Sequence, residues 1–432
     1  MIATLALGAL LLGQTAGQGY FKQVVKSPTG KNGFEEMVLA GDLLRQGGFG
    51  IYLRLSDVPA GQIEESKFSP PEAAVWNAFR SLTLLQRRRA IVKKFTPVLD
   101  LLERASQKDI YDPRKDMDFN TLLPEQSGFK DVAKLLPVAV YVAFADGQGQ
   151  RGVQLLTTGL DVFDRLSRGL LIQYLVGVAS SNILLPCVEE HLPRMSQKDA
   201  VRLEQASLAL IEREPAVRYS IELELSLVPT IIRKTMAEFK PEDVDMMIGF
   251  AEETDREKAL KTLKGMTPAE RGRVAEGVSS RVVEVQKEAR TALAGTEADW
   301  VAFKPDDPMK ADWSNANGLI DAIASSALPS YAAVARAAAI SRTRLRLLGL
   351  ACGVLRHRWE HGQLPIRLED AVGKERAVDP LSREAFELRK DVSGNFSIFS
   401  KGTKETGEIG LRYKRPAGEA VEPPNGATGA DR

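Results

Sequence analysis

The sequence predicts a mainly α protein, in which a body of helical hairpins is followed by a long C-terminal helix and a small β-hairpin. Aromatic residues make up only 6% of the 432 residues, which suits a core of Ala, Leu and Val better than a β-sandwich. Apolar residues recur at helical spacing across residues 69–294. The period changes to two near residues 385–400, where a β-hairpin is therefore expected.

Residues 1–17 read as a secretory signal peptide. The run from Ile2 to Leu12 is almost entirely apolar, and small residues follow it, with cleavage expected near Ala16 or Gly17. The run is shorter than the roughly 20 apolar residues that span a bilayer, and a buried N-terminal helix is the alternative. We therefore expect an exported protein of the periplasm, the extracellular space or the cell envelope. The later apolar segments are short or interrupted by polar residues, so we expect no transmembrane span in the mature chain.

A small N-terminal segment, residues 18–68, is rich in Gly and turn residues. It contains one predicted helix over 33–44 and a possible short strand over 51–55. Strong helix-start signals come next, at residues 69–72 and 267–270. Each places a hydroxyl at the N-cap, Pro at the first helical position and Glu at the third, which is a capping box.

The region 69–294 is predicted to be a series of helical hairpins, interrupted by a linker over 111–128. The pairs 129–166 and 170–213 each form a hairpin that would leave an apolar face exposed. Such hairpins stack into a solenoid-like body, and an irregular bundle is the open alternative. Helices are expected near residues 70–95, 97–106, 129–145, 149–166, 170–191, 197–213, 216–238, 241–263 and 268–294.

The C-terminal third divides into three parts. Residues 295–329 carry Pro305 and Pro308 and are expected to be a second linker. Residues 330–415 follow, with a long helix over 330–361 that stops at Gly362, then strands over 385–389 and 396–400 joined by a turn at 392–395. The tail 416–432 is rich in Gly, Pro and Ala and is expected to be disordered.

Composition excludes several classes of function. With 58 Lys plus Arg against 57 Asp plus Glu, the chain lacks the basic surplus of a nucleic-acid binder. Its two cysteines, Cys187 and Cys352, form neither a disulfide framework nor a C-x-x-C motif. No phosphate-binding loop or nucleophile elbow is present, so no small-molecule ligand can be inferred.

The sharpest chemical motif is an H-x-x-E-H stretch at residues 357–361. It matches inverted zinc peptidases, with His357 and His361 as zinc ligands and Glu360 as the general base. However, the apolar stripe of the helix places both histidines on its polar side, in the last turn, where they interact favourably with the helix dipole. We therefore predict no catalytic, cofactor or metal site, and keep a zinc-dependent hydrolase as the alternative.

Three weaker patterns are given structural interpretations. Cys187, four residues before His191, is expected to be a buried thiol rather than a nucleophile. The basic run over residues 87–94 is expected to be a solvated helix end, with a phosphate or lipid headgroup contact as the alternative. The alternating arginines over residues 342–346 are likewise expected to lie on a solvated helix side.

The C-terminal region resembles the globular part of type II secretion major pseudopilins. The resemblance rests on the helix over 344–359, the helix-ending pattern Glu360-His361-Gly362, the turn at 379–382 and the segment 396–402. It implies a long helix that runs into a hairpin. The prepilin peptidase motif is missing, so a filament subunit is not implied. In those proteins an acidic loop binds calcium. The corresponding loop here, residues 403–408, contains Lys404 and few carboxylates, so the resemblance does not imply a calcium site.

The whole chain is also similar to a set of uncharacterised exported bacterial proteins. The shared segments are 28–44, the helical stretch 170–177 and the pseudopilin-like end. This resemblance implies no known activity. Together with the absence of a catalytic constellation, it favours a non-enzymatic envelope protein that binds a protein partner, as a scaffold or assembly factor.

Overall fold

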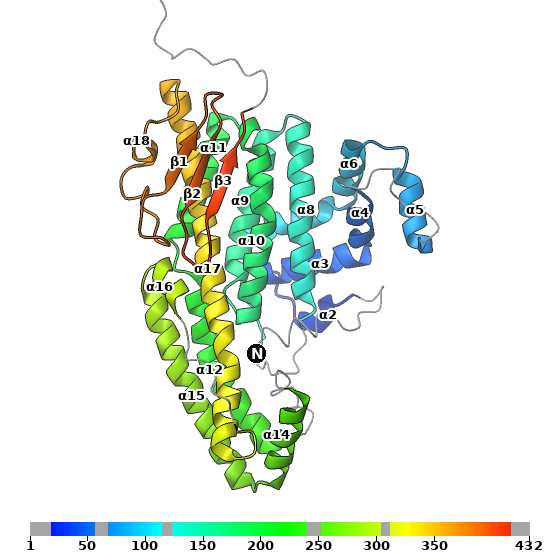
Figure 1. The fold of residues 1–432 in the computed structure, drawn as a ribbon. Helices are drawn as coiled ribbons and strands as arrows, with labels where there is room; N and C mark the ends of the chain where they lie inside the picture. Colours follow the sequence, from blue (N-terminus) through cyan, green and yellow to red (C-terminus); the bar gives the residue numbers. More distant parts are fainter. Residues whose placement is uncertain (1–18, 57–67, 115–122, 240–251, 304–311, 416–432) are drawn as a thin grey trace, which may run out of the picture.

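The computed structural model describes residues 19–56, 68–114, 123–239, 252–303 and 312–415. It confirms the mainly α prediction: helices form most of the described chain, and one small antiparallel sheet lies near the C-terminus (Figure 1). The proposed signal peptide, 1–17, and the tail, 416–432, lie outside the described residues.

The N-terminal helices build one side of the body. The helix α3 packs against α7 and α8, where a Cβ on Gly41 would lie 2.7 Å from the Cα of Gly128. Only glycine allows helices α3 and α8 to approach this closely. The helices of this part are α2 (Phe21–Val24), α3 (Gly33–Gln46), α4 (Phe49–Ser56), α5 (Pro70–Phe79), α6 (Leu84–Lys94) and α7 (Thr96–Ser106).

Four long helices form the centre of the body. The helix α8 packs against α3, α6, α9 and α10, and α11 packs chiefly against α17 and α9. In a solenoid each hairpin would contact only its neighbours, so the body is an irregular bundle. These helices are α8 (Glu125–Ala145), α9 (Gly149–Leu166), α10 (Leu171–His191) and α11 (Gln197–Glu212), with the short 3-10 helix η3 (Leu192–Arg194) between the last two.

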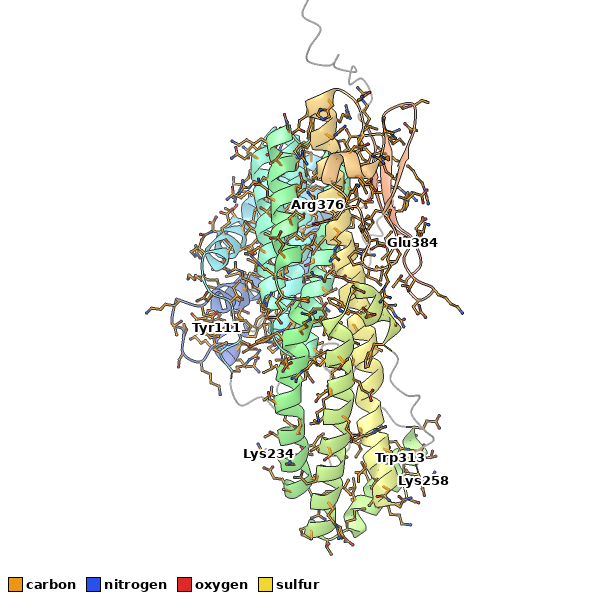
Figure 2. All side chains as sticks on the ribbon, turned by 90° about the vertical axis from the view of Figure 1, so that its left-hand side faces the viewer. Tyr111, Lys234, Lys258, Trp313, Arg376 and Glu384 are labelled. Atoms are coloured by element: carbon orange, nitrogen blue, oxygen red, sulfur yellow. The ribbon has the colours of Figure 1, made fainter. Side chains whose placement is uncertain are left out.

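A second core lies outside the body, in what we call the arm: residues 229–239, 253–283 and 313–324. Here α12, α14, α15 and the start of α17 enclose an apolar cluster that includes Ile232, Val278 and Ile323. The arm projects away from the body (Figures 1 and 2). Its helices are α12 (Ala216–Glu238), α14 (Glu253–Gly265), α15 (Pro268–Ala294) and α17 (Ala316–His361).

The C-terminal sheet covers the last part of α17. Its strand order is β1-β2-β3, with antiparallel neighbours. In β3 the side chains of Ile409, Leu411 and Tyr413 are buried and those between them are exposed, which matches the contact of β3 with α17. The elements are α18 (Leu368–Val372), β1 (Glu387–Lys390), β2 (Phe396–Ser400) and β3 (Ile409–Tyr413).

Several predicted boundaries are wrong. The possible strand 51–55 is part of helix α4, in which Phe49 and Tyr52 make edge-to-face contacts with Phe95. The single helix 70–95 is two helices, because Thr83 starts α6 with a capping box. The linker 111–128 ends earlier, since α8 begins at Glu125.

The predicted linker 295–329 is also wrong in part. It contains helix α16 (Glu297–Ala302), and α17 begins at Ala316 rather than near 330. The Asn315 side chain caps α17 by accepting a hydrogen bond from the Gly318 amide at 2.9 Å, and Leu319 and Ile323 are buried in the arm. The start of the predicted helix 241–263 lies outside the described residues, and α14 covers its end.

Two buried carboxylates fasten α17 to its neighbours. Glu297 of α16 accepts hydrogen bonds from Arg342 and Arg346, each at 2.9 Å. Glu204 of α11 accepts from Arg356 at 3.2 Å and from Arg376 at 2.8 Å. Both glutamate side chains are at most 7% exposed, so these charge-assisted pairs act in a medium of low dielectric constant.

We expect Glu297→Gln to lower the free energy of unfolding by about 2–3 kcal/mol at pH 7, because two partly buried guanidiniums lose their carboxylate. Burial alone would raise the pKa of Glu297, but Arg346 and Arg342 hold it below its usual 4.5. The stabilisation is therefore present above pH 4.5 and is lost as the pH falls through the lowered pKa.

Urea denaturation of both proteins from pH 3 to 8 tests this expectation. Glu284→Gln serves as the control, since its pair with Arg281 is exposed and should contribute less than about 0.5 kcal/mol. A Glu297→Gln protein as stable as the control at pH 7 would show that the ion pairs of Glu297 with Arg342 and Arg346 do not stabilise the fold.

Candidate functional site

The H-x-x-E-H residues lie at the exposed C-terminal end of α17. The rings of His357 and His361 are edge to face with centroids 4.2 Å apart. Burial, followed by the neighbouring His361, lowers the pKa of His357. The side chain of Glu360 is 40% exposed and pairs with Arg356 at 3.4 Å rather than with a histidine. Gly362, at a positive φ of 69°, ends the helix, as the sequence predicts.

The part of the chain that the structure describes places no third zinc ligand beside the two histidines. In the described ranges, no group of three or more His, Cys, Asp or Glu side chains is arranged to hold a metal ion. Asp370 contributes to the electrostatic field at His357, but its carboxylate caps α18 by accepting from the Arg367 amide at 2.9 Å. The tail carboxylates Glu419 and Glu422 lie outside the described residues.

Cys187 and His191 are both buried on α10. Burial raises the pKa of the Cys187 thiol to about 12, which makes it a poor nucleophile at neutral pH. His191 is stacked on Phe144, with ring centroids 4.7 Å apart. Neither ring nitrogen of His191 has a hydrogen-bond partner among the residues that the structure describes. The pair is therefore a packing element and not an acid–base couple.

The basic run on α6 is a solvated helix end only in part: Arg89, Lys93 and Lys94 are exposed, whereas Arg87 and Arg88 are not. Arg87 is 6% exposed, donates to the carbonyls of Phe79 and Leu82 and lies over the Trp76 ring. Arg88 lies over the Tyr141 ring at 4.1 Å. These cations are used in cation–π and backbone contacts, which the sequence alone did not reveal.

The arginines over 342–346 also differ from expectation. Arg344 is exposed, whereas Arg342 and Arg346 are partly buried and bind Glu297. Arg342 additionally donates to the carbonyl of Ile211 at 2.5 Å. This contact brings α17 to the C-terminal end of α11, beside a cavity.

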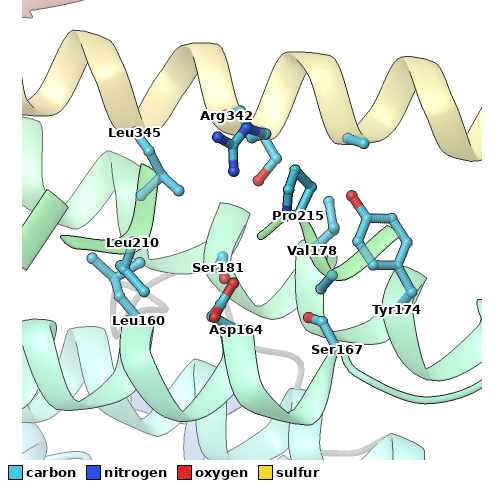
Figure 3. Close-up of a pocket in the computed structure, with 13 residues that line it drawn as sticks. Leu160, Asp164, Ser167, Tyr174, Val178, Ser181, Leu210, Pro215, Arg342 and Leu345 are labelled. Atoms are coloured by element: carbon cyan, nitrogen blue, oxygen red, sulfur yellow. The ribbon is translucent and has the colours of Figure 1, made fainter. Parts of the chain in front are cut away.

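The cavity lies where α9, α10 and α11 meet the start of α12 and the middle of α17 (Figure 3). Its volume is about 50 Å³, room for roughly four water molecules. Polar groups line it together with apolar ones, and sequence reasoning missed it because its residues come from five helices. The lining residues are Leu160, Asp164, Ser167, Tyr174, Val178, Ser181, Leu210, Pro215, Ala216, Ala338, Ser341, Arg342 and Leu345.

Two side chains of opposite charge, Asp164 and Arg342, face the cavity from opposite sides (Figure 3). Asp164 of α9 accepts from Arg213 at 3.3 Å, and burial raises the pKa of its carboxyl. Arg342 reaches in from α17, across the space from Asp164 (Figure 3). The cavity thus combines a hydrogen-bond acceptor, a cation and several hydroxyls, which suits a small polar ligand or ordered water.

Comparisons with protein-family models, with curated proteins and with solved structures found no significant match to this chain. One described helix, Leu171–Arg194, is long and apolar enough to cross a membrane, and 67% of its most apolar window is buried inside the fold.

We expect His191→Phe to raise the free energy of unfolding by about 1 kcal/mol at pH 7, because it removes two buried nitrogens that lack partners and keeps the stack on Phe144. Burial lowers the pKa of His191 below its usual 6.5, so the unfolded chain binds a proton more readily than the folded one. The native protein should therefore lose stability as the pH falls below 6.5, and the variant should lose less.

Thermal unfolding between pH 5 and 8 provides the measurement, with exposed His361→Gln as the control that should follow the native protein. Equal pH dependence in native protein and His191→Phe would show that His191 does not titrate with unfolding.

Proposed function

We propose that this protein is a non-enzymatic scaffold or assembly factor of the cell envelope, which binds a protein partner through its arm. The observation that carries the proposal is the separate apolar core of the arm. An arm with its own core keeps a defined surface at a distance from the body. At 1.5 Å per residue, the 27-residue α15 alone is about 40 Å long.

The described surface of the arm favours a polar contact. It carries positive and negative side chains joined in ion pairs, among them Arg233 with Glu276 and Lys258 with Asp255. These side chains are largely exposed. The exposed large apolar side chains of the described chain lie outside the arm. A charged surface of this kind supports a salt-sensitive, charge-complementary interface rather than an obligate apolar one.

The envelope location is proposed from the sequence of residues 1–17. The resemblance to major pseudopilins is supported by the order of elements: the long helix α17, a turn at Pro365, the turn held by Asp379 and then the strands β2 and β3. Asp379 is fully buried and accepts hydrogen bonds from Ser382 and Ser400, at 2.7 and 2.6 Å.

Site-specific photocrosslinking in envelope fractions tests the scaffold proposal. A crosslinking residue at Lys234 or Lys258, both exposed on the arm (Figure 2), should capture one specific protein. The same residue at Lys198, exposed on the body, should capture little of it. The captured fraction should fall several-fold between 0.05 and 0.5 M salt, as surface charges are screened. Equal capture from both regions would contradict a role for the arm.

A zinc-dependent hydrolase remains the second candidate, favoured by the adjacent rings of His357 and His361. It requires about one zinc ion per chain, lost in His357→Ala, together with a hydrolytic activity abolished by Glu360→Gln. We expect purified protein to contain less than about 0.1 zinc per chain by elemental analysis. Stoichiometric zinc that disappears in His357→Ala would overturn this expectation and favour the hydrolase.

A further inference from the structure

Three hydroxyl side chains meet at the cavity between the body helices and α17. Tyr174, Ser181 and Ser341 are 5%, 9% and 8% exposed. All three line the cavity, and within the described ranges none of the three hydroxyls makes a hydrogen bond to another protein group. Each hydroxyl can therefore hydrogen-bond to whatever occupies the cavity, whose space admits molecules of the size of water. Three hydroxyls around one space favour a polar occupant over an apolar one.

The positive end of a long helix lies at the same place. The 23-residue α12 begins at Ala216, beside the cavity, and no side chain caps its first turn. Ala216 and Val217 are 6% and 0% exposed, so their amides are buried at a helix end that normally requires an acceptor. Such an end attracts anions through its N–H groups and its dipole.

Arg342 adds a cation with donors to spare. Its Nε binds Glu297 and one Nη binds the carbonyl of Ile211, which accounts for two of the five N–H bonds of a guanidinium. Opposite it, the Oδ2 atom of Asp164 accepts from Arg213, whereas no described residue donates to Oδ1. The site therefore offers many donors and one carboxylate acceptor.

We propose that this cavity binds a small oxyanion that retains a proton, with inorganic hydrogen phosphate as its simplest form. Its oxygens would accept from the start of α12, from Arg342 and from the three hydroxyls, and its own O–H would donate to Asp164. The cavity volume of about 50 Å³ suits an ion of five non-hydrogen atoms better than a larger metabolite. This ligand site is independent of the arm surface.

Isothermal titration calorimetry of the full chain at pH 7 compares phosphate with sulfate. The two ions have the same shape and similar size, but only phosphate keeps a proton at this pH. We expect one phosphate per chain and an affinity at least about 10-fold higher than for sulfate, which places an oxygen without a proton against Asp164. Glycerol phosphate, tested in parallel, distinguishes a free ion from a terminal phosphate group.

Variants assign the binding to the cavity. Tyr174→Phe and Ser341→Ala should each weaken phosphate binding by about 10-fold, since each removes one hydrogen bond to an anion. Asp164→Asn should reduce the preference for phosphate over sulfate, because an amide can donate to either ion. Ser279→Ala is the control: it is buried in the arm and donates to the Ala275 carbonyl at 2.7 Å.

The proposal is overturned if phosphate shows no saturable binding, if sulfate binds equally well, or if Tyr174→Phe and Ser341→Ala bind phosphate like the native protein. Should Asp164→Asn fail to fold, Tyr174→Phe still decides the matter, because it deletes a single oxygen and leaves the ring in place.

Discussion

The buried ion pairs of Glu204 and Glu297 hold together segments that are far apart in the sequence. Each carboxylate is bound by two arginines, and each set includes at least one arginine of α17. Through them the single helix α17 is joined to α11, to α16 and to the loop before β1. Because a buried charge without its partner is costly, these pairs fix the position and rotation of α17 between Arg342 and Arg356. The arm, the body and the sheet take their relative places from that helix.

Regular amphipathic helices were predictable from the sequence. The helices over 149–166 and 268–294 match α9 and α15, because both have strong apolar periodicity and a capping box marks the start of α15. The errors fall where local pattern is ambiguous. A short apolar run such as 51–55 fits a strand or a helix, and the packing of Tyr52 against Phe79 and Phe95 decides for the helix. The third strand was missed although Ile409, Leu411 and Tyr413 alternate.

The two candidate sites differ in how far the sequence reveals them. The pair His357 and His361 is visible in the sequence because a spacing of four places two residues on one helical face. The cavity is not visible, because its hydroxyls and charges are spread from Leu160 to Leu345 and meet only after the helices pack. Arg342 was interpreted as solvated because its partner, Glu297, lies in a segment that prolines and acidic residues had marked as a linker. Neither residue alone signals a buried ion pair.

The contact of Arg342 with the Ile211 carbonyl joins residues 131 positions apart. During synthesis, α11 is made before α17, and the segment that contains α12, α14 and α15 is made in between. Until α17 is made, the face of α11 that packs on it has no partner. Because this contact is between distant parts of the sequence, no neighbouring segment covers that face of α11 in the meantime. Complete packing of α11 therefore requires the last third of the chain.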